Sequence, residues 1–331
     1  MKTSRLGLEG PEVSQFGIGA MSFAGIYGSA TEDESFAILD AARSAGVSHI
    51  DTAAAYGDGR SEEIIGKWLA ANPGARDETT IATKAAFRTL DGKRMLSNDP
   101  VWMEEMLDRS LDLLGVEAVD IFYAHRIEPG RNPEEVAGEM GRLVEKGKTK
   151  SIAFSEIAPS TLRRAASEFP IAAVQSEYSL QTRAPELGLV QACAEVGAAL
   201  VAFCPVGRGL LTDTPPSVAK IDGSNFLKTN PRFIEPNFST NLALTEPFRA
   251  QAAALGVPAA GLAIAGVVAQ GDHVIPIPGT KSVSHLKELL AGMALDLSED
   301  DLSKIEAVLP VGWCHGDRYN EAQWQGPERY S

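Results

Sequence analysis

The chain has little cysteine, no long apolar stretch and a deficit of positive charge, and each shortage excludes a class of protein. Its three cysteines, Cys193, Cys204 and Cys314, are odd in number and form no Cys-x-x-Cys pair. This argues against a disulfide framework and against a zinc ribbon, so we expect no metal site and thiols that pack in a reducing compartment.

The charge balance disfavours two classes of partner. Lysine and arginine number 30 against 44 acidic residues, which gives a net charge of −14. A nucleic acid or an anionic membrane surface needs a basic face, whereas a small anionic cofactor needs only a local positive pocket. No run of about 18 apolar residues occurs, and the first residues lead into no apolar leader. We therefore expect a soluble, cytoplasmic protein with no nucleic-acid or membrane partner.

Two common phosphate-binding motifs are also missing. Gly17-Ile18-Gly19 is followed by Ala-Met-Ser, so the Gly-x-Gly-x-x-Gly fingerprint of dinucleotide-binding folds is absent. Gly147-Lys148-Thr149 resembles the end of a Walker A loop, but the first glycine of that loop would fall on Arg142. Neither nucleotide-binding loop is predicted.

What the chain does have is an alternation of short apolar segments with amphipathic ones. The predicted strands are Phe16–Met21, Val47–Thr52, Thr80–Lys84, Val119–His125, Ser151–Ser155, Ala173–Glu177, Leu200–Pro205 and Val274–Ile277. The predicted helices are Glu32–Ser44, Glu62–Ala71, Val101–Leu114, Pro133–Glu145, Ser160–Ser167, Pro185–Val196, Ala259–Ala269, Ser284–Ala291 and Leu297–Leu309. Strands that are apolar on both faces and alternate with helices indicate parallel β/α units. A single α/β domain over residues 1–331, a (β/α)₈ TIM barrel, accounts for eight strands, and a doubly wound open sheet is the alternative.

Two segments interrupt this rhythm. Residues 206–245, after the seventh strand, contain four prolines and little periodicity, and a loop of this length is usually functional or mobile. The tail, residues 310–331, carries Trp313, His315, Trp324 and Tyr330 among polar residues. These aromatic side chains either cover an apolar pocket at the active-site face or only dock the terminus.

Polar residues stand at or just after the ends of three consecutive predicted strands. Asp51 ends the second strand and Tyr56 follows in the next loop, while Lys84 and His125 end the third and fourth strands. Strand ends of a barrel converge on one face, where active sites lie. Charged residues are poor choices for apolar strand ends unless they find partners there.

These residue types suit the reduction of a carbonyl group. The alkoxide formed by hydride addition needs a proton, and a tyrosine with a pKa near 10 gives and takes one reluctantly. An ammonium stabilises the tyrosinate, a carboxylate holds the ammonium, and a neutral imidazole donates a hydrogen bond to the substrate oxygen. Taken singly, each residue has an ordinary structural role, as a salt bridge, a structural histidine or a loop tyrosine. It is their joint occurrence that favours catalysis.

The segment Ile50–Glu62, which contains Asp51 and Tyr56, resembles the signature of the aldo-keto reductase superfamily. Further similar segments surround Lys84, His125, Gln175, Gly207 and Lys281, so the resemblance runs from about Leu6 to Leu309. It is greatest to a plant and bacterial branch of monomer-sized NADPH-dependent enzymes, which implies a monomer or a weak homo-oligomer. The resemblance implies a barrel that binds NADPH without a Rossmann motif and reduces a small aldehyde or ketone, with Tyr56 as the proton donor. A cofactor-binding regulatory subunit of the same fold is the alternative function.

The resemblance also implies cofactor and substrate positions. Ser155, Glu156 and Gln175 match the nicotinamide carboxamide binders, and Phe203 matches the aromatic residue that stacks on the ring. The phosphates and adenine are assigned to Pro205, Gly207, Arg208, Gly209, Leu210, Gly279, Lys281, Ser282, His285 and Glu288. Candidate substrate contacts are Phe23, Tyr27, Phe87, Arg126 and Trp313, whose aromatic character suggests an apolar or cyclic carbonyl compound.

This sequence departs from its relatives near the adenine and the 2′-phosphate. Glu288 is followed by Leu289 where asparagine is common, and no arginine lies between Lys281 and Glu288. NADPH is therefore expected over NADH on the strength of Lys281 and Ser282, together with His285 or Lys287. A lysine in a solvated loop is the alternative interpretation of Lys281.

Overall fold

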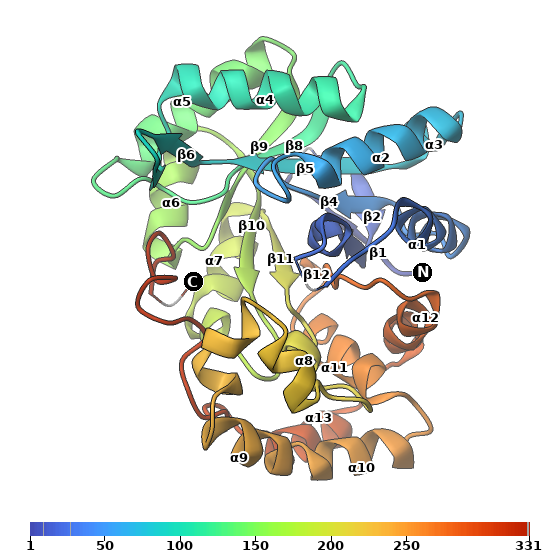
Figure 1. Cartoon of the computed structure of the whole chain (residues 1–331). Coiled ribbons are helices and arrows are strands. Elements are labelled where there is room, and N and C mark those ends of the chain that lie inside the picture. The colour runs from blue at the N-terminus through green and yellow to red at the C-terminus, as the bar shows by residue number, and fades with distance from the viewer. Residues whose placement is uncertain (9, 27, 330) are drawn as a thin grey trace.

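A computed structural model describes residues 1–8, 10–26, 28–329 and 331 (Figure 1). Eight parallel strands form one sheet, and each predicted apolar segment contributes one of them. They are β3 (Gly17–Gly19), β4 (His49–Asp51), β5 (Thr80–Ala85), β8 (Val119–Ala124), β9 (Thr149–Ser155), β10 (Ile171–Glu177), β11 (Ala199–Phe203) and β12 (Val274–Pro276). The two outermost strands meet because Gly19 N donates a 3.0 Å hydrogen bond to Pro278 O. The sheet is therefore a barrel, and the open-sheet alternative is wrong.

A helix follows each barrel strand and covers its outer face (Figure 1). These helices are α1 (Glu32–Ser44), α2 (Arg60–Ala71), α4 (Pro100–Leu114), α5 (Pro133–Glu145), α6 (Pro159–Glu168), α7 (Leu189–Val196), α11 (Ala259–Val268) and α12 (Val283–Ala291). Local sequence sets their ends: Asp99 caps α4 by accepting a hydrogen bond from Trp102 N, and Gly115 ends it with φ 65°. The main core lies between these helices and the strands.

The barrel interior holds small side chains, including Ala82, Ala153 and Ala199, beside larger ones such as Ile121 and Tyr123. At its amino-terminal end, an antiparallel hairpin of β1 (Thr3–Arg5) and β2 (Glu12–Ser14) adds the buried side chains of Leu6 and Val13. Because this end is filled from below, the open end of the barrel is the face where the strands end.

Residues 206–245 are more regular than their sequence suggests. They fold into η3 (Gly207–Gly209), α8 (Val218–Asp222), η4 (Leu227–Thr229), η5 (Pro231–Phe233) and α9 (Asn237–Leu244). Helices of three to eight residues are too short to show a periodic pattern, which is why an irregular loop was expected. Together with α10 (Glu246–Ala254), α13 (Glu299–Val308) and the start of the tail, this segment forms a second hydrophobic core.

The remaining elements are short or peripheral. They are η1 (Ala20–Ala24), α3 (Ala75–Glu78), η2 (Ala184–Leu187), α10 (Glu246–Ala254), η6 (Gly292–Ala294), α13 (Glu299–Val308) and a hairpin of β6 (Phe87–Leu90) and β7 (Lys93–Leu96). The β6–β7 hairpin was not predicted, and it stands directly after β5 at the open face. Among the described residues, no single helix is long and apolar enough to cross a membrane. The stretch Asn237–Ala254, which contains α9 and α10, passes the test of length and composition only when it is taken together with α11, as a bent pair.

Candidate active site

Three strand ends bring the predicted polar residues to the open face of the barrel. Asp51 and Lys84 lie on neighbouring strands, β4 and β5, and both are buried. Lys84 Nζ donates to Asp51 Oδ1 at 2.5 Å and to Thr52 O at 2.6 Å. The ammonium therefore has one carboxylate partner and one carbonyl partner in an apolar setting, which is how a buried lysine keeps its charge.

Lys84 also lies between two tyrosine rings. Its Nζ is 5.3 Å from the ring centroid of Tyr56 and 5.5 Å from that of Tyr123. Burial lowers the pKa of Lys84, and the charge of Asp51 acts in the opposite direction. Tyr56 is half-buried in the turn between β4 and α2, so it adjoins the ammonium and also reaches the open face.

His125 follows β8, and two aromatic rings approach its ring edge to face. The ring of Tyr56 lies 6.0 Å from it and the ring of Phe87 5.0 Å, measured between centroids. Burial holds the pKa of His125 well below 6.5, and the charges of Arg126, Lys84 and Arg94 act in the same direction. The imidazole is therefore neutral. Among the described residues, its buried Nδ1 has no hydrogen-bond partner.

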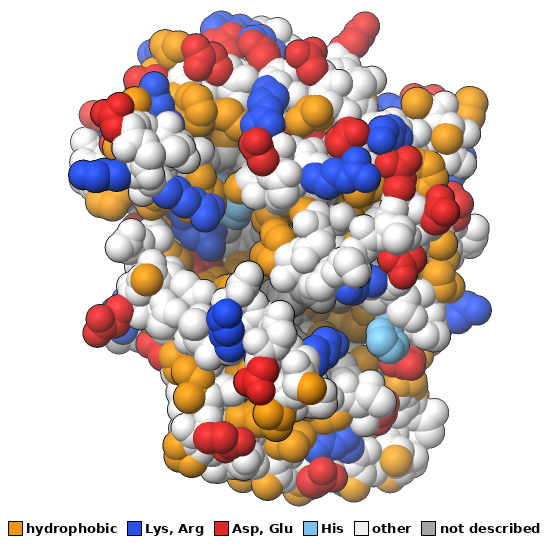
Figure 2. Space-filling model, in the orientation of Figure 1, with side chains coloured by type: hydrophobic (Ala, Val, Ile, Leu, Met, Phe, Trp, Pro, Cys, Tyr) orange, Lys and Arg blue, Asp and Glu red, His pale blue; other side chains and the backbone are white. Residues whose placement is uncertain are grey.

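One face of the molecule is hollowed. Figure 2 shows a hollow in which part of a histidine is visible, with Lys and Arg side chains along one side of it. Among the described residues, no group of three or more His, Cys, Asp or Glu side chains is arranged to hold a metal ion.

A second layer of side chains supports Asp51 from inside the barrel. Gln175, which was assigned to the nicotinamide carboxamide, donates from Nε2 to Asp51 Oδ2 at 2.8 Å. Tyr123 is completely buried, and burial raises its pKa well above 10, as does the charge of Asp51. Sequence reasoning gave Tyr123 no role. It lies two residues before His125, so strand alternation places both side chains inside the barrel, and that was the available signal.

The proposed carboxamide binders Ser155 and Glu156 lie at the end of β9. Ser155 Oγ accepts a 3.1 Å hydrogen bond from Arg126 Nη1. Glu156 has φ 60°, and its carboxylate forms an ion pair with Arg318 at 2.7 Å and accepts a hydrogen bond from Glu177 N at 2.9 Å. Most of the bonding capacity of Glu156 is thus directed at the tail and at β10.

Beside Glu156 lies a group of buried charges that the sequence did not reveal. Glu177, at the end of β10, pairs with Arg208 at 2.6 Å and with Arg232 at 3.2 Å. Burial opposes the charge of Glu177, but Arg208, Arg232 and Arg318 hold its pKa below 4.5. We call Glu156, Glu177, Arg208, Arg232 and Arg318 the arginine cluster. It joins the barrel to the segment 206–245 and to the tail.

The positions expected near the pyrophosphate follow β11. Gly207 and Gly209 have φ values of 58° and 94°, and a side chain at Gly207 would collide with Gln181. Arg208 lies with its guanidinium 4.5 Å from the ring centroid of Phe226. Pro205 and Leu210 are buried, whereas Phe203 is partly exposed, as a stacking residue must be.

The positions expected near the 2′-phosphate gather at the start of α12. Ser282 caps this helix, with its Oγ accepting from His285 N, and Lys281 Nζ donates to Ser29 O at 3.0 Å. His285 is exposed and Glu288 is half-buried. Gly279 packs tightly against Gly19, since an added Cβ would lie 2.9 Å from Gly19 O. Leu289 is buried in the main core, which explains the apolar residue at that position.

The five candidate substrate residues separate into different environments. Phe87 and Arg126 lie beside His125. Phe23 is buried in the main core, and Trp313 is buried in the second core, where its Nε1 donates to Leu180 O at 2.7 Å. Phe23 and Trp313 therefore have packing roles here, and Tyr27 lies outside the described residues.

The tail covers part of the open face, which is one of the two roles that its sequence left open. Glu328 N donates to Glu156 O, and Glu328 Oε2 accepts a 2.6 Å hydrogen bond from Ala158 N. Gly326 lies against Arg126, because an added Cβ would be 3.0 Å from Arg126 Cγ. In Figure 1 the tail runs from α13 toward α6, and its Arg318 pairs with Glu156.

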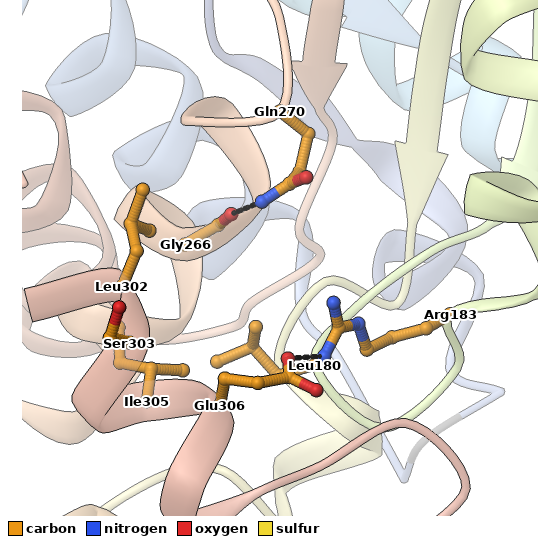
Figure 3. A pocket seen from close by; sticks show the side chains of 8 residues that line it. All are labelled: Leu180, Arg183, Gly266, Gln270, Leu302, Ser303, Ile305 and Glu306. Carbon is orange, nitrogen blue, oxygen red and sulfur yellow. Dashed lines mark hydrogen bonds and ion pairs between the residues drawn. The ribbon is translucent and has the colours of Figure 1, made fainter. Parts of the chain in front are cut away.

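A separate cavity of about 260 Å³ lies away from these residues, between α11, α13 and the segment after β10 (Figure 3). Its lining includes Arg183, whose guanidinium pairs with Glu186 and Glu306. None of the predicted site residues lines this cavity, and its arginine is already neutralised by two carboxylates.

Comparison with known proteins gives consistent results. The model of the Aldo/keto reductase family matches residues 15–310. The chain is 35% identical to an NADP(+) aldo-keto reductase of Schizosaccharomyces pombe over 93% of this chain and 92% of that one. It is 36% identical to a probable aldo-keto reductase of Glycine max over 95% and 91% of the two chains. A glycerol dehydrogenase from Gluconobacter oxydans has a similar structure, with a TM-score of 0.81, 25% identity and coverage of 93% and 95%.

Proposed function

Because the chain belongs to the aldo/keto reductase family and uses NADP(H) as its members do, we propose that it reduces an aldehyde or ketone to an alcohol, with NADPH preferred over NADH. The observation that carries this proposal is the grouping of Tyr56, Lys84, Asp51 and His125 at the open end of one barrel. When bound, the nicotinamide supplies the hydride, and the protein must supply the proton and the orientation.

The residues fit such a cofactor at two places. At the start of α12, an ammonium, the Ser282 hydroxyl and free backbone amides of a helix terminus lie together, which is a donor set suited to a phosphate. After β11, Gly207 and Gly209 carry no side chain, so a phosphate chain can approach the backbone closely.

The proton is assigned to the hydroxyl of Tyr56. The nearby ammonium of Lys84 favours the phenolate that remains after transfer, and Asp51 fixes that ammonium with the help of Gln175. His125 is neutral and donates a hydrogen bond to the carbonyl oxygen, which orients the carbonyl carbon toward the hydride. Reversal of the same steps oxidises an alcohol, and the likeness to a glycerol dehydrogenase adds small polyols to the alcohols worth testing.

A screen of aldehydes and ketones with NADPH and with NADH tests this function. We expect oxidation of NADPH that depends on the carbonyl compound and that is faster than with NADH. A folded protein that binds NADPH but turns over none of the compounds would instead favour a cofactor-binding regulatory subunit.

The pH profile tests the state of His125. Since its pKa lies well below 6.5, the imidazole stays neutral as the pH falls from about 8 to about 6.5. We expect kcat/KM to show no acid limb attributable to His125 in that interval. An acid limb near 6.5 that disappears in His125→Gln would contradict the assignment.

A further inference from the structure

Two arginines at the hollow lack an acidic partner, although the protein carries a net charge of −14. Within the described part of the chain, neither Arg94 nor Arg126 has a carboxylate oxygen within 4.0 Å of its side-chain nitrogens. The arginines of the arginine cluster differ in this respect, since Arg208 and Arg318 each pair with a buried glutamate. Two unneutralised guanidinium groups beside one histidine mark a place that favours an anion.

Arg94 reaches the site from the β6–β7 hairpin. Register places Arg94 opposite Thr89 and Phe87 opposite Leu96, so Arg94 and Phe87 share one face of the hairpin. The guanidinium of Arg94 lies 4.2 Å from the ring centroid of Phe87, and that ring lies 5.0 Å from His125. Arg88 is on the other face, where its guanidinium lies 5.0 Å from the ring of Trp102.

Arg126 approaches His125 from the other side, between β8 and β9. Its Nη1 donates to His125 O at 2.5 Å and to Ser155 Oγ at 3.1 Å, and Gly326 of the tail packs on its side-chain stem. Both of these hydrogen bonds use Nη1, and a guanidinium has five N–H donors in a planar fork. The group is thus held in place and has donors suited to a planar anion.

The cofactor does not account for these two charges. The residues suited to its phosphates follow β11 and β12, whereas Arg94 and Arg126 follow β5 and β8, on the other side of the barrel. The part of the cofactor assigned to Ser155 is the carboxamide, which is uncharged. The remaining occupant of the hollow is the substrate.

We infer that the preferred substrate is a carbonyl compound that also bears a carboxylate, held by Arg94 and Arg126 while its carbonyl oxygen meets Tyr56 and His125. This deepens the proposed function and rests on it. It also revises the apolar substrate expected from the aromatic residues, since Phe87 now supports Arg94 and Trp313 lies in the second core.

Matched pairs of aldehydes test the inference. We would compare para-formylbenzoate with para-formylbenzamide, and meta-formylbenzoate with meta-formylbenzamide, because each pair differs in charge but hardly in size. A charged hydrogen bond is worth about 1.5–3 kcal/mol, so kcat/KM for the better carboxylate should exceed that of its amide by about 10- to 100-fold. Added salt should reduce this ratio, because the guanidinium groups are partly exposed.

Variants then locate the preference. Arg94→Gln and Arg126→Gln should each reduce the carboxylate-to-amide ratio several-fold, and Arg88→Gln, on the opposite face of the same hairpin, should leave the ratio at the wild-type value. A wild-type ratio near one, or equal ratios in Arg94→Gln, Arg126→Gln and Arg88→Gln, would overturn the inference. The wild-type ratio and its salt dependence remain decisive if a variant does not fold. If none of the aldehydes oxidises NADPH, it is the proposed function that has failed.

Discussion

Two sets of buried charges lie at the open face of the barrel, and they differ in how far apart in the chain their members lie. The pair Lys84–Asp51 joins neighbouring strands, 33 residues apart. The arginine cluster joins Glu156 to Arg318, 162 residues away, and Glu177 to Arg232, 55 residues away. The barrel strands alone form the first set. The second set links the segment 206–245 and the tail to the barrel. The two sets should therefore respond differently to mutation.

Tyr56→Phe should have the largest effect on activity and almost none on structure. It removes the proposed proton donor while the contact between Lys84 and Asp51 remains. We expect a loss of at least about 10²-fold in kcat, the usual scale for general acid catalysis, with cofactor affinity and melting temperature close to wild type. Turnover near the wild-type rate would reject Tyr56 as the donor.

Lys84→Met should remove activity and also lower stability. The variant leaves Asp51 buried with only Gln175 and no cation, which costs about 3 kcal/mol in the free energy of unfolding. Its melting temperature should therefore lie below that of Tyr56→Phe, as measured by calorimetry on both. If the two variants have the same melting temperature, the buried pair of Lys84 and Asp51 contributes no stability.

The same difference in chain separation explains how much could be predicted from the sequence. The barrel and the relative places of Asp51, Lys84 and His125 were predicted because strand ends converge whatever the loops do. The partners of Glu156 and Glu177 were not predicted, because no local sequence pattern indicates that Arg232 and Arg318 fold back to β9 and β10.

Local patterns also failed where elements are short or where a side chain has two possible partners. The β6–β7 hairpin, with strands of four residues each, and the short helices of residues 206–245 give no periodic signal. Gln175 was assigned to the cofactor from resemblance, and its bond to Asp51 depends on the interior geometry of the barrel.

Lys281→Ala examines a third kind of charge, one that lies outside both sets. Lys281 Nζ donates to Ser29 O beside the first turn of α12, where a 2′-phosphate would meet the lysine and the helix amides. Since only NADPH carries that phosphate, we expect its affinity to fall about 10- to 100-fold with little change for NADH. Titration of both cofactors against both proteins measures this. An equal change for the two cofactors would place the 2′-phosphate elsewhere.

Arg318→Gln should have the smallest effect on chemistry and should separate the arginine cluster from the catalytic pair. The substitution removes the cation that pairs with Glu156 and the donor that Arg318 Nη2 gives to Ser331 Oγ, so the tail loses its buried anchor. We expect faster proteolysis after the helix α13 and a KM raised a few-fold through the contact of Gly326 with Arg126, with kcat close to wild type.

Arg329→Gln is the matched control, since Arg329 also stacks on Trp324 of the tail but pairs with no carboxylate within the described residues. Equal digestion rates for the two variants would show that the tail is held by its aromatic contacts, and a large fall in kcat in Arg318→Gln would show that the two sets of charges act as one.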